Sequence, residues 1–138
     1  MKKFIPALSH SVLPFAFFLA AISARAADAG WAGQYRADKF LSGRAVFQFS
    51  IEQSGSAIKV TFDAAWNDGH GAAPEAEGPA TVSGNTLNFK FEDSFGNKGT
   101  GTVTRSGKDV IVSINPTHVA EARCLQFYGK NMQLKRVK

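Results

Sequence analysis

The feature that most constrains the fold is a regular alternation of short glycine turns and longer loops between runs of alternating apolar and polar residues. Residues 47–51 and 58–62 are two such runs, and residues 53–56, which include Gly55, separate them. Side chains alternate between the two faces of a strand, so each run predicts a half-buried strand and the pair predicts a hairpin. Residues 83–85 and 105–108 predict two further hairpin turns.

A fourth hairpin is predicted from Leu125 and Phe127 to Met132 and Leu134, with residues 129–131 as its turn. No segment has a sustained helical period. The longer connections are expected at residues 36–43, 64–78, 93–98 and 115–122. The sequence therefore predicts an all-β chain: a small antiparallel up-and-down meander of about eight or nine strands that forms a barrel or a strongly curled sheet. All tight turns should lie at one end and all long loops at the other.

Large aromatic side chains occupy the positions predicted to face the interior. About eight strands enclose a space that side chains can just fill. The rings expected there are those of Phe47, Phe49, Phe62, Phe89, Phe91 and Phe127. Gly99 and Gly101 would supply the small partners that such rings need. We therefore expect a dry core with little room for a deep ligand cavity.

The first 26 residues have the pattern of a secretory signal peptide. Lys2 and Lys3 precede an apolar stretch at about residues 12–22, and Ala24-Arg25-Ala26 fits a cleavage site. Residues 27–138 would then form a single mature domain, periplasmic or secreted and without a membrane anchor. Removal of the leader lowers the formal net charge from +5 to +2. So small a charge does not favour a nucleic-acid partner.

Cys124 is the single cysteine, so an internal disulfide cannot form. If residues 124–128 form a strand with Leu125 and Phe127 facing the barrel core, Cys124 faces outward. The sequence thus leaves two states open, a monomer and a Cys124-linked dimer.

The long-loop end, here called the rim, gathers side chains that are scattered in the sequence. Residues 64–78 form the longest connection, and loops of that length in a compact domain are often functional. Exposed aromatic anchors ringed by polar groups are typical of protein interfaces. The candidate partner-binding residues are Phe40, Trp66, Asp68, His70, Phe95 and His118.

Two alternatives place other chemistry at the rim. Gly30-Trp31 resembles the start of lipocalin-like barrels, and in that case Trp31, Tyr35 and Trp66 would line a small-ligand site in the barrel mouth. His70 and His118 would instead suit a metal site, since zinc accepts imidazole ligands, but no short histidine spacing fixes the ligand set.

No motif predicts an enzyme or a cofactor. Glu75 and Glu77 fall in an Ala/Gly/Pro-rich stretch that gives acid and base groups little rigid support. The sequence favours an exported binding module, of the inhibitor or immunity type, that engages an envelope or extracellular protein through its rim. Cell-wall hydrolases are candidate targets by analogy of class alone.

Overall fold

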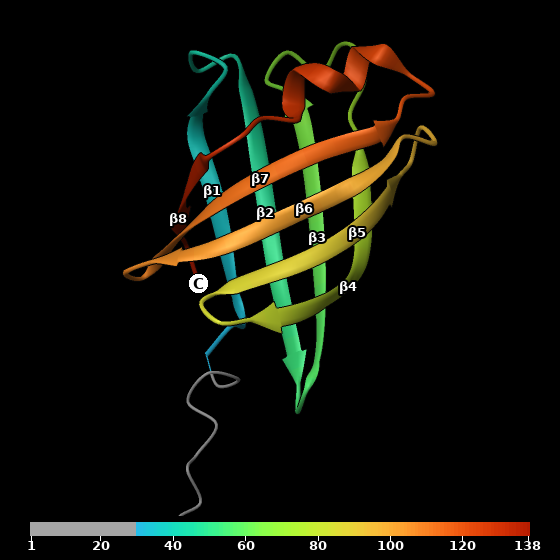
Figure 1. Cartoon of the computed structure of the whole chain (residues 1–138). Coiled ribbons are helices and arrows are strands. Elements are labelled where there is room, and N and C mark those ends of the chain that lie inside the picture. Colours follow the sequence, from blue (N-terminus) through green and yellow to red (C-terminus); the bar gives the residue numbers. More distant parts are fainter. Residues whose placement is uncertain (1–29) are drawn as a thin grey trace, which may run out of the picture.

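The computed structural model describes residues 30–138, which form one closed barrel of eight antiparallel strands connected as a meander (Figure 1). The predicted signal peptide lies outside the described residues. The strands are β1 (Gly33–Phe40), β2 (Ala45–Ser54), β3 (Ala57–Trp66), β4 (Glu75–Ser83), β5 (Thr86–Asp93), β6 (Lys98–Ser106), β7 (Asp109–His118) and β8 (Met132–Arg136). A six-residue 3-10 helix, η1 (Ala122–Phe127), lies between β7 and β8. The predicted all-β meander is confirmed.

Three two-residue turns close one end of the barrel. Gly55, Gly84 and Gly107 each take the first central position of a turn, with φ of +61°, +61° and +62°. The second central residue keeps a negative φ in each case, which is the type II′ pattern suited to the twist of a hairpin. Glycine is required at the first position because other residues rarely adopt that φ.

The interior is filled by phenylalanine rings. Phe62 is the hub, with ring centroids 5.6 Å from Phe47, 6.4 Å from Phe49 and 5.3 Å from Phe91. Gly101 is paired in register with Phe89, and a Cβ at Gly101 would overlap the Phe89 ring. The predicted combination of large rings and small glycines is therefore present.

The predicted fourth hairpin is wrong. Residues 122–127 form η1, in which Cys124 and Phe127 are buried while Leu125 is exposed. A burial spacing of three residues is the period of a 3-10 helix, whereas a strand would have buried every second residue. Loss of this segment leaves eight strands, and an even number allows a purely antiparallel barrel to close.

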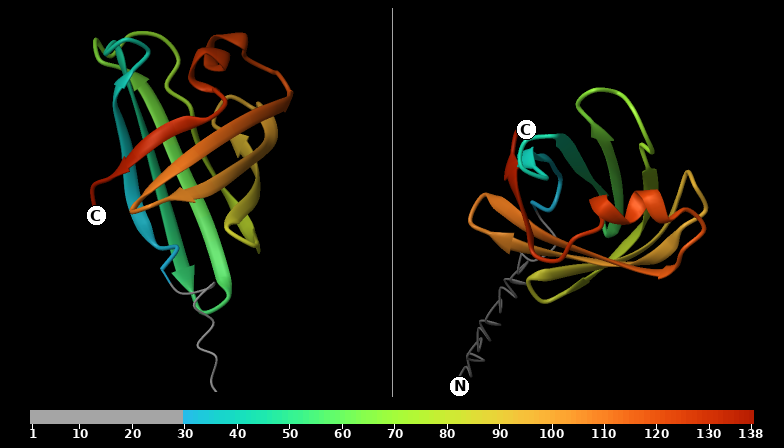
Figure 2. Two further views of the ribbon diagram at one scale, coloured as in Figure 1. Left: turned by 60° about the vertical axis from the view of Figure 1, so that its left-hand side comes forward. Right: turned by 90° about the horizontal axis from the view of Figure 1, so that it is seen from above.

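Three of the four rim loops are shorter than expected because the strands extend into them, whereas the connection from β7 to β8, which contains η1, is longer. Phe40 ends β1, Trp66 ends β3 and His118 ends β7, while Glu75 already begins β4. Figure 2 shows η1 and the connection between β3 and β4 at the same end of the barrel. At the opposite end the start of β1 meets the end of the chain, and the Gln34 backbone N–H donates to the Lys138 carbonyl at 2.8 Å.

Candidate binding surface at the rim

Aromatic side chains close the barrel mouth from inside. The ring centroid of Phe127 lies 5.2 Å from that of Trp66 and 6.3 Å from that of Phe40. We call Phe40, Trp66 and Phe127 the mouth cluster. The Arg44 guanidinium covers the outer side of the Trp66 ring at 5.7 Å from its centroid. Phe40 and Trp66 are half-buried and pack against the core. They therefore close the barrel mouth and do not project from it as exposed anchors.

The connection between β3 and β4, residues 67–74, is fixed to the barrel by hydrogen bonds; we call it the rim loop. The Asn67 side-chain amide donates to the Gly43 carbonyl at 2.6 Å, and the Asn67 backbone N–H donates to the Arg44 carbonyl at 2.9 Å. Ala72 and Pro74 are buried. The rim loop is thus tied both to the β1–β2 turn and to the core.

The tip of the rim loop carries two of the predicted site residues into solvent. The side chains of Asp68 and His70 are 70% and 89% exposed. The His70 backbone N–H donates to Asp68 Oδ1 at 2.9 Å, and His70 Nδ1 lies 3.8 Å from Asp68 Oδ2. Their exposure therefore comes with a defined local conformation.

A buried polar network joins the β5–β6 turn to η1. Asp93 Oδ1 accepts from the Asn97 backbone N–H at 2.9 Å, and Asp93 Oδ2 accepts from the Asn97 side-chain amide at 2.8 Å and from the Tyr128 hydroxyl. Asn97 Oδ1 accepts from the backbone N–H groups of Ala120 and Glu121 at 2.8 and 2.9 Å. We call Asp93, Asn97 and Tyr128 the polar network, and it fixes the approach to η1.

Burial and hydrogen bonding change the acidity of two groups around this network. Burial, and then the hydrogen bond to Asp93, raise the pKa of the Tyr128 hydroxyl far above its ordinary value. Burial also raises the pKa of the Cys124 thiol, and the nearby Asp93 carboxylate adds to that effect. Both groups are held in their protonated forms at neutral pH.

The expectation that Cys124 faces outward is wrong. Its side chain is fully buried under η1, because this segment is helical and not extended. A Cys124-linked dimer would require η1 to move away from the barrel.

The predicted small-ligand site is divided between the two ends of the barrel. Trp31 is buried at the tight-turn end, where the Arg105 guanidinium lies 4.0 Å from its ring centroid. Tyr35 is also buried, within β1. Trp66 lies at the rim, so the prediction that these three side chains line one mouth is wrong: β1 starts at the tight-turn end.

His70 and His118 are both exposed at the rim, His70 on the rim loop and His118 at the last position of β7. Within residues 30–138, no group of three or more His, Cys, Asp or Glu side chains is placed to hold a metal ion. Phe95, the remaining predicted site residue, is half-buried and packs against the core.

Comparison of the chain with protein-family models, curated proteins and solved structures gives no match. In the part of the chain that the structure describes, no helix has the length and apolar character needed to cross a membrane.

Two elements of the surface were missed by sequence reasoning. One is the polar network, whose sequence signal is an Asp-x-x-x-Asn spacing across a tight turn. Asp93 Oδ1 also accepts from the Phe95 N–H two residues on. Aspartate and asparagine favour turns of this kind. The other is the role of Ala72 and Pro74, which look like linker residues and instead anchor the rim loop.

Proposed function

We propose that the protein is an exported binding module that engages a protein partner in the periplasm or outside the cell through the rim loop. The observation that carries this proposal is that Asp68 and His70 are exposed on a loop hydrogen-bonded to the barrel at both ends. Asn67 makes the bonds at one end, and at the other the Pro74 carbonyl accepts from the Ala64 N–H at 3.0 Å. Binding by a preformed loop costs less conformational entropy than binding by a mobile one.

The candidate residues fall into an exposed polar group and a half-buried aromatic group, and this arrangement supports the proposed function. Asp68 and His70 present a carboxylate and an imidazole to a partner, and His118 adds a second exposed imidazole at the same end. Phe40, Trp66 and Phe95 are half-buried and support the surface from below. Contact residues carried on a rigid scaffold are the usual arrangement in protein inhibitors, which change little in shape on binding.

A narrow loop tip on a filled barrel suits a concave partner site. The mechanism we propose is occlusion, in which the tip enters the cleft of an enzyme and blocks access to it. Cell-wall hydrolases are the class to test first, because they act in the compartment to which the predicted signal peptide would direct the chain.

The test uses the mature protein and a variant that changes only the tip, Asp68→Ala with His70→Ala. Both side chains are exposed, so the melting temperature should change by less than about 2 °C. The wild type should inhibit hydrolysis of purified peptidoglycan by envelope extract, and should bind the responsible enzyme in surface plasmon resonance. The variant should bind at least tenfold more weakly.

The matched control is Glu52→Ala with Lys108→Ala, two exposed charges toward the tight-turn end. It should bind like the wild type. A role for the rim loop would be contradicted if the tip variant bound as tightly as the wild type, or if the control lost as much affinity as the tip variant. Trp66→Ala is a poorer test, because Trp66 belongs to the mouth cluster and its loss would also disturb the fold.

A further inference from the structure

The least paired boundary in the barrel wall is the seam between β1 and β8. Only two register pairs join these strands, Tyr35 with Arg136 and Arg36 with Lys135, whereas β2 and β3 share ten. Toward the rim the strands have no further register pairs, and β1 has a bulge between Ala37 and Phe40. Pairing across the seam is therefore confined to its tight-turn half.

Backbone alternation identifies the groups that face the open half of the seam. The Arg136 backbone N–H donates to Asp109 of β7, so the N–H of Gln133, three residues earlier, faces the opposite side, toward β1. On β1, Gln34 bonds to the end of the chain through both its N–H and its carbonyl, and Arg36 is paired with Lys135. Gln133 is the next residue in this series on β8, and it has no register partner on β1.

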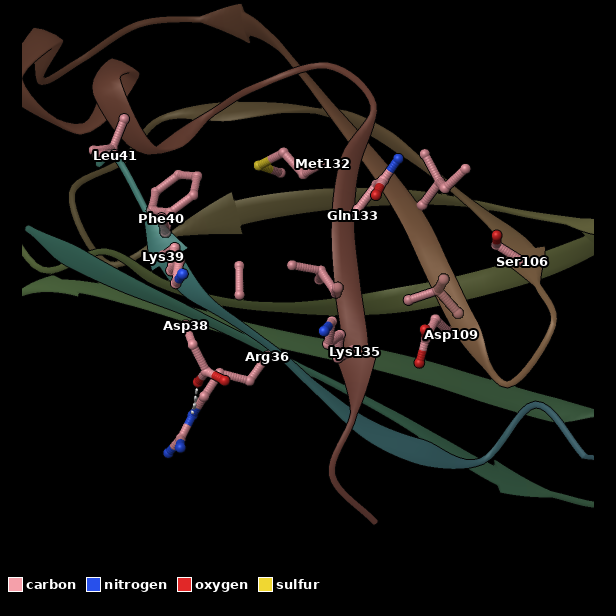
Figure 3. A pocket seen from close by; sticks show the side chains of 14 residues that line it. Arg36, Asp38, Lys39, Phe40, Leu41, Ser106, Asp109, Met132, Gln133 and Lys135 are labelled. Atoms are coloured by element: carbon pink, nitrogen blue, oxygen red, sulfur yellow. Dashed lines mark ion pairs between the residues drawn. The ribbon is translucent and has the colours of Figure 1, made fainter. Parts of the chain in front are cut away.

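A groove of about 550 Å³ follows this open half (Figure 3). Its floor is apolar: Ala37 and Phe40 come from β1, and Met132 and Leu134 from β8. Figure 3 shows the Met132 side chain directed from β8 toward Phe40. We call this the β1–β8 groove.

Three basic side chains, Arg36, Lys39 and Lys135, and two acidic ones, Asp38 and Asp109, line the β1–β8 groove, so its formal charge is +1. Arg36 Nε lies 3.8 Å from Asp38 Oδ1, and the carboxylate of Asp109 accepts the Arg136 N–H. Lys39 and Lys135 are exposed, and none of the ion pairs within residues 30–138 involves either of them. Two lysines on opposite strands thus remain available to an acidic ligand.

We infer that the β1–β8 groove binds an extended acidic peptide segment of a partner, by addition of a strand at the seam. Alternate side chains of such a segment point to opposite faces. Apolar side chains would then lie on Phe40 and Met132, and acidic ones would lie beside Lys39 and Lys135. The edge of β8 at Gln133 would supply backbone hydrogen bonds, as in other cases of strand addition. This site is separate from the rim loop.

The test uses a fluorescein-labelled octapeptide of alternating valine and glutamate, with blocked ends, and measures fluorescence anisotropy with the mature protein. We expect saturable binding that weakens at least tenfold in Lys39→Glu with Lys135→Glu. A second octapeptide, in which lysine replaces each glutamate, tests the charge dependence. The same variant should bind this peptide more tightly than the wild type does. A glutamate peptide methylated at alternate backbone nitrogens should bind at least tenfold more weakly, because it cannot complete the strand pairing.

The matched control is Lys90→Glu with Lys98→Glu, which reverses two exposed charges on the β5–β6 side and should leave binding unchanged. In the amide NMR spectrum of the wild type, the largest shifts on adding the peptide should be those of Ala37, Phe40 and Gln133. The inference would be overturned if the wild type did not bind the peptide, or if Lys39→Glu with Lys135→Glu bound it as tightly as the wild type. Chemical-shift changes centred on other residues would also overturn it. Binding of dodecanoate in this groove without binding of the peptide would also overturn it, in favour of an apolar carboxylate ligand.

Discussion

At the scale of single residues, the polar network carries the strongest structural signal. Asp93 and Asn97 are both buried, and hydrogen bonds account for both Asp93 carboxylate oxygens and for the side-chain amide of Asn97. A buried polar group that loses its partner costs more than the hydrogen bond itself was contributing. The residues of this network should therefore be intolerant of substitution although none of them is itself a predicted contact residue.

Asn97→Ala should lower the free energy of unfolding by about 2–4 kcal/mol, because Asp93 Oδ2 loses the amide donor and the N–H groups of Ala120 and Glu121 lose their acceptor. Urea denaturation followed by circular dichroism measures this. Asn88→Ala, at an exposed position of β5, is the control and should cost less than about 0.5 kcal/mol. Similar losses in both variants would show that the network adds no special stability.

Cys124 should be slow to react in the folded protein. The thiolate is the reactive form, and both burial and the raised pKa of Cys124 keep its concentration low. With a disulfide exchange reagent at pH 8, the wild type should react at least tenfold more slowly than the urea-unfolded chain, and Asn97→Ala should fall between the two. Rapid reaction of the native wild type would contradict the burial of this thiol.

At the scale of elements, the strands could be predicted and η1 could not. An alternation such as Phe47, Phe49 and Ile51 is a direct consequence of one buried and one exposed face, so it can be read without tertiary information. Residues 124–128 are ambiguous, because the buried set of Cys124, Phe127 and Tyr128 depends on contacts with Asp93 and the mouth cluster. Register at the β1–β8 seam is likewise set by tertiary closure, and no local pattern predicts it.

The β3–β4 pair contains a measurable electrostatic cost. Asp63 is opposite Glu75, and partial burial, then repulsion from Glu75, raise the pKa of the Asp63 carboxyl. The pKa of Asp63 in the folded state thus exceeds its pKa in the unfolded state, so the folded state holds the proton more tightly. The free energy of unfolding therefore falls as pH rises from the unfolded-state pKa to the folded-state pKa. Above that window the full cost is present.

Asp63→Asn should therefore raise the melting temperature at pH 7 by roughly 1–3 °C. The gain should disappear at a pH below the ordinary aspartate range, where the wild-type carboxyl is protonated in both states. Differential scanning calorimetry between pH 2.5 and 7 measures it. A gain that does not depend on pH would assign the effect to packing instead.

At the scale of the whole molecule, the filled interior separates stability from recognition. The rings around Phe62 pack with centroid distances of 5.3 to 6.4 Å, and Tyr128 joins them at 5.9 Å. Large inward rings opposite glycines were predictable from the alternation alone. Whether the rim aromatics project or plug the barrel was not, since it depends on how β1, β3 and η1 converge at one end.

Phe62→Ala should destabilise the protein by about 3–5 kcal/mol and leave an apolar cavity at the hub. The wild type should bind neither benzene nor xenon at the hub, whereas the variant should bind either of them in the new space. Chemical denaturation gives the cost, and native-state titration gives the binding. A wild type that binds such ligands with equal affinity would refute a filled interior.

The hydrogen bonding of Gln34 to Lys138 toward the tight-turn end has a practical consequence for how the molecule can be used. A dye, a solid support or a second protein joined after Lys138 would project away from the rim and from the open half of the β1–β8 groove. In a chain that begins at Gly30, a short linker to Lys138 would also suit circular permutation. New termini could then be opened in the type II′ turns at Gly55 or Gly84 with both candidate surfaces left intact, whereas Ser106 and Asp109 beside the third turn line the β1–β8 groove.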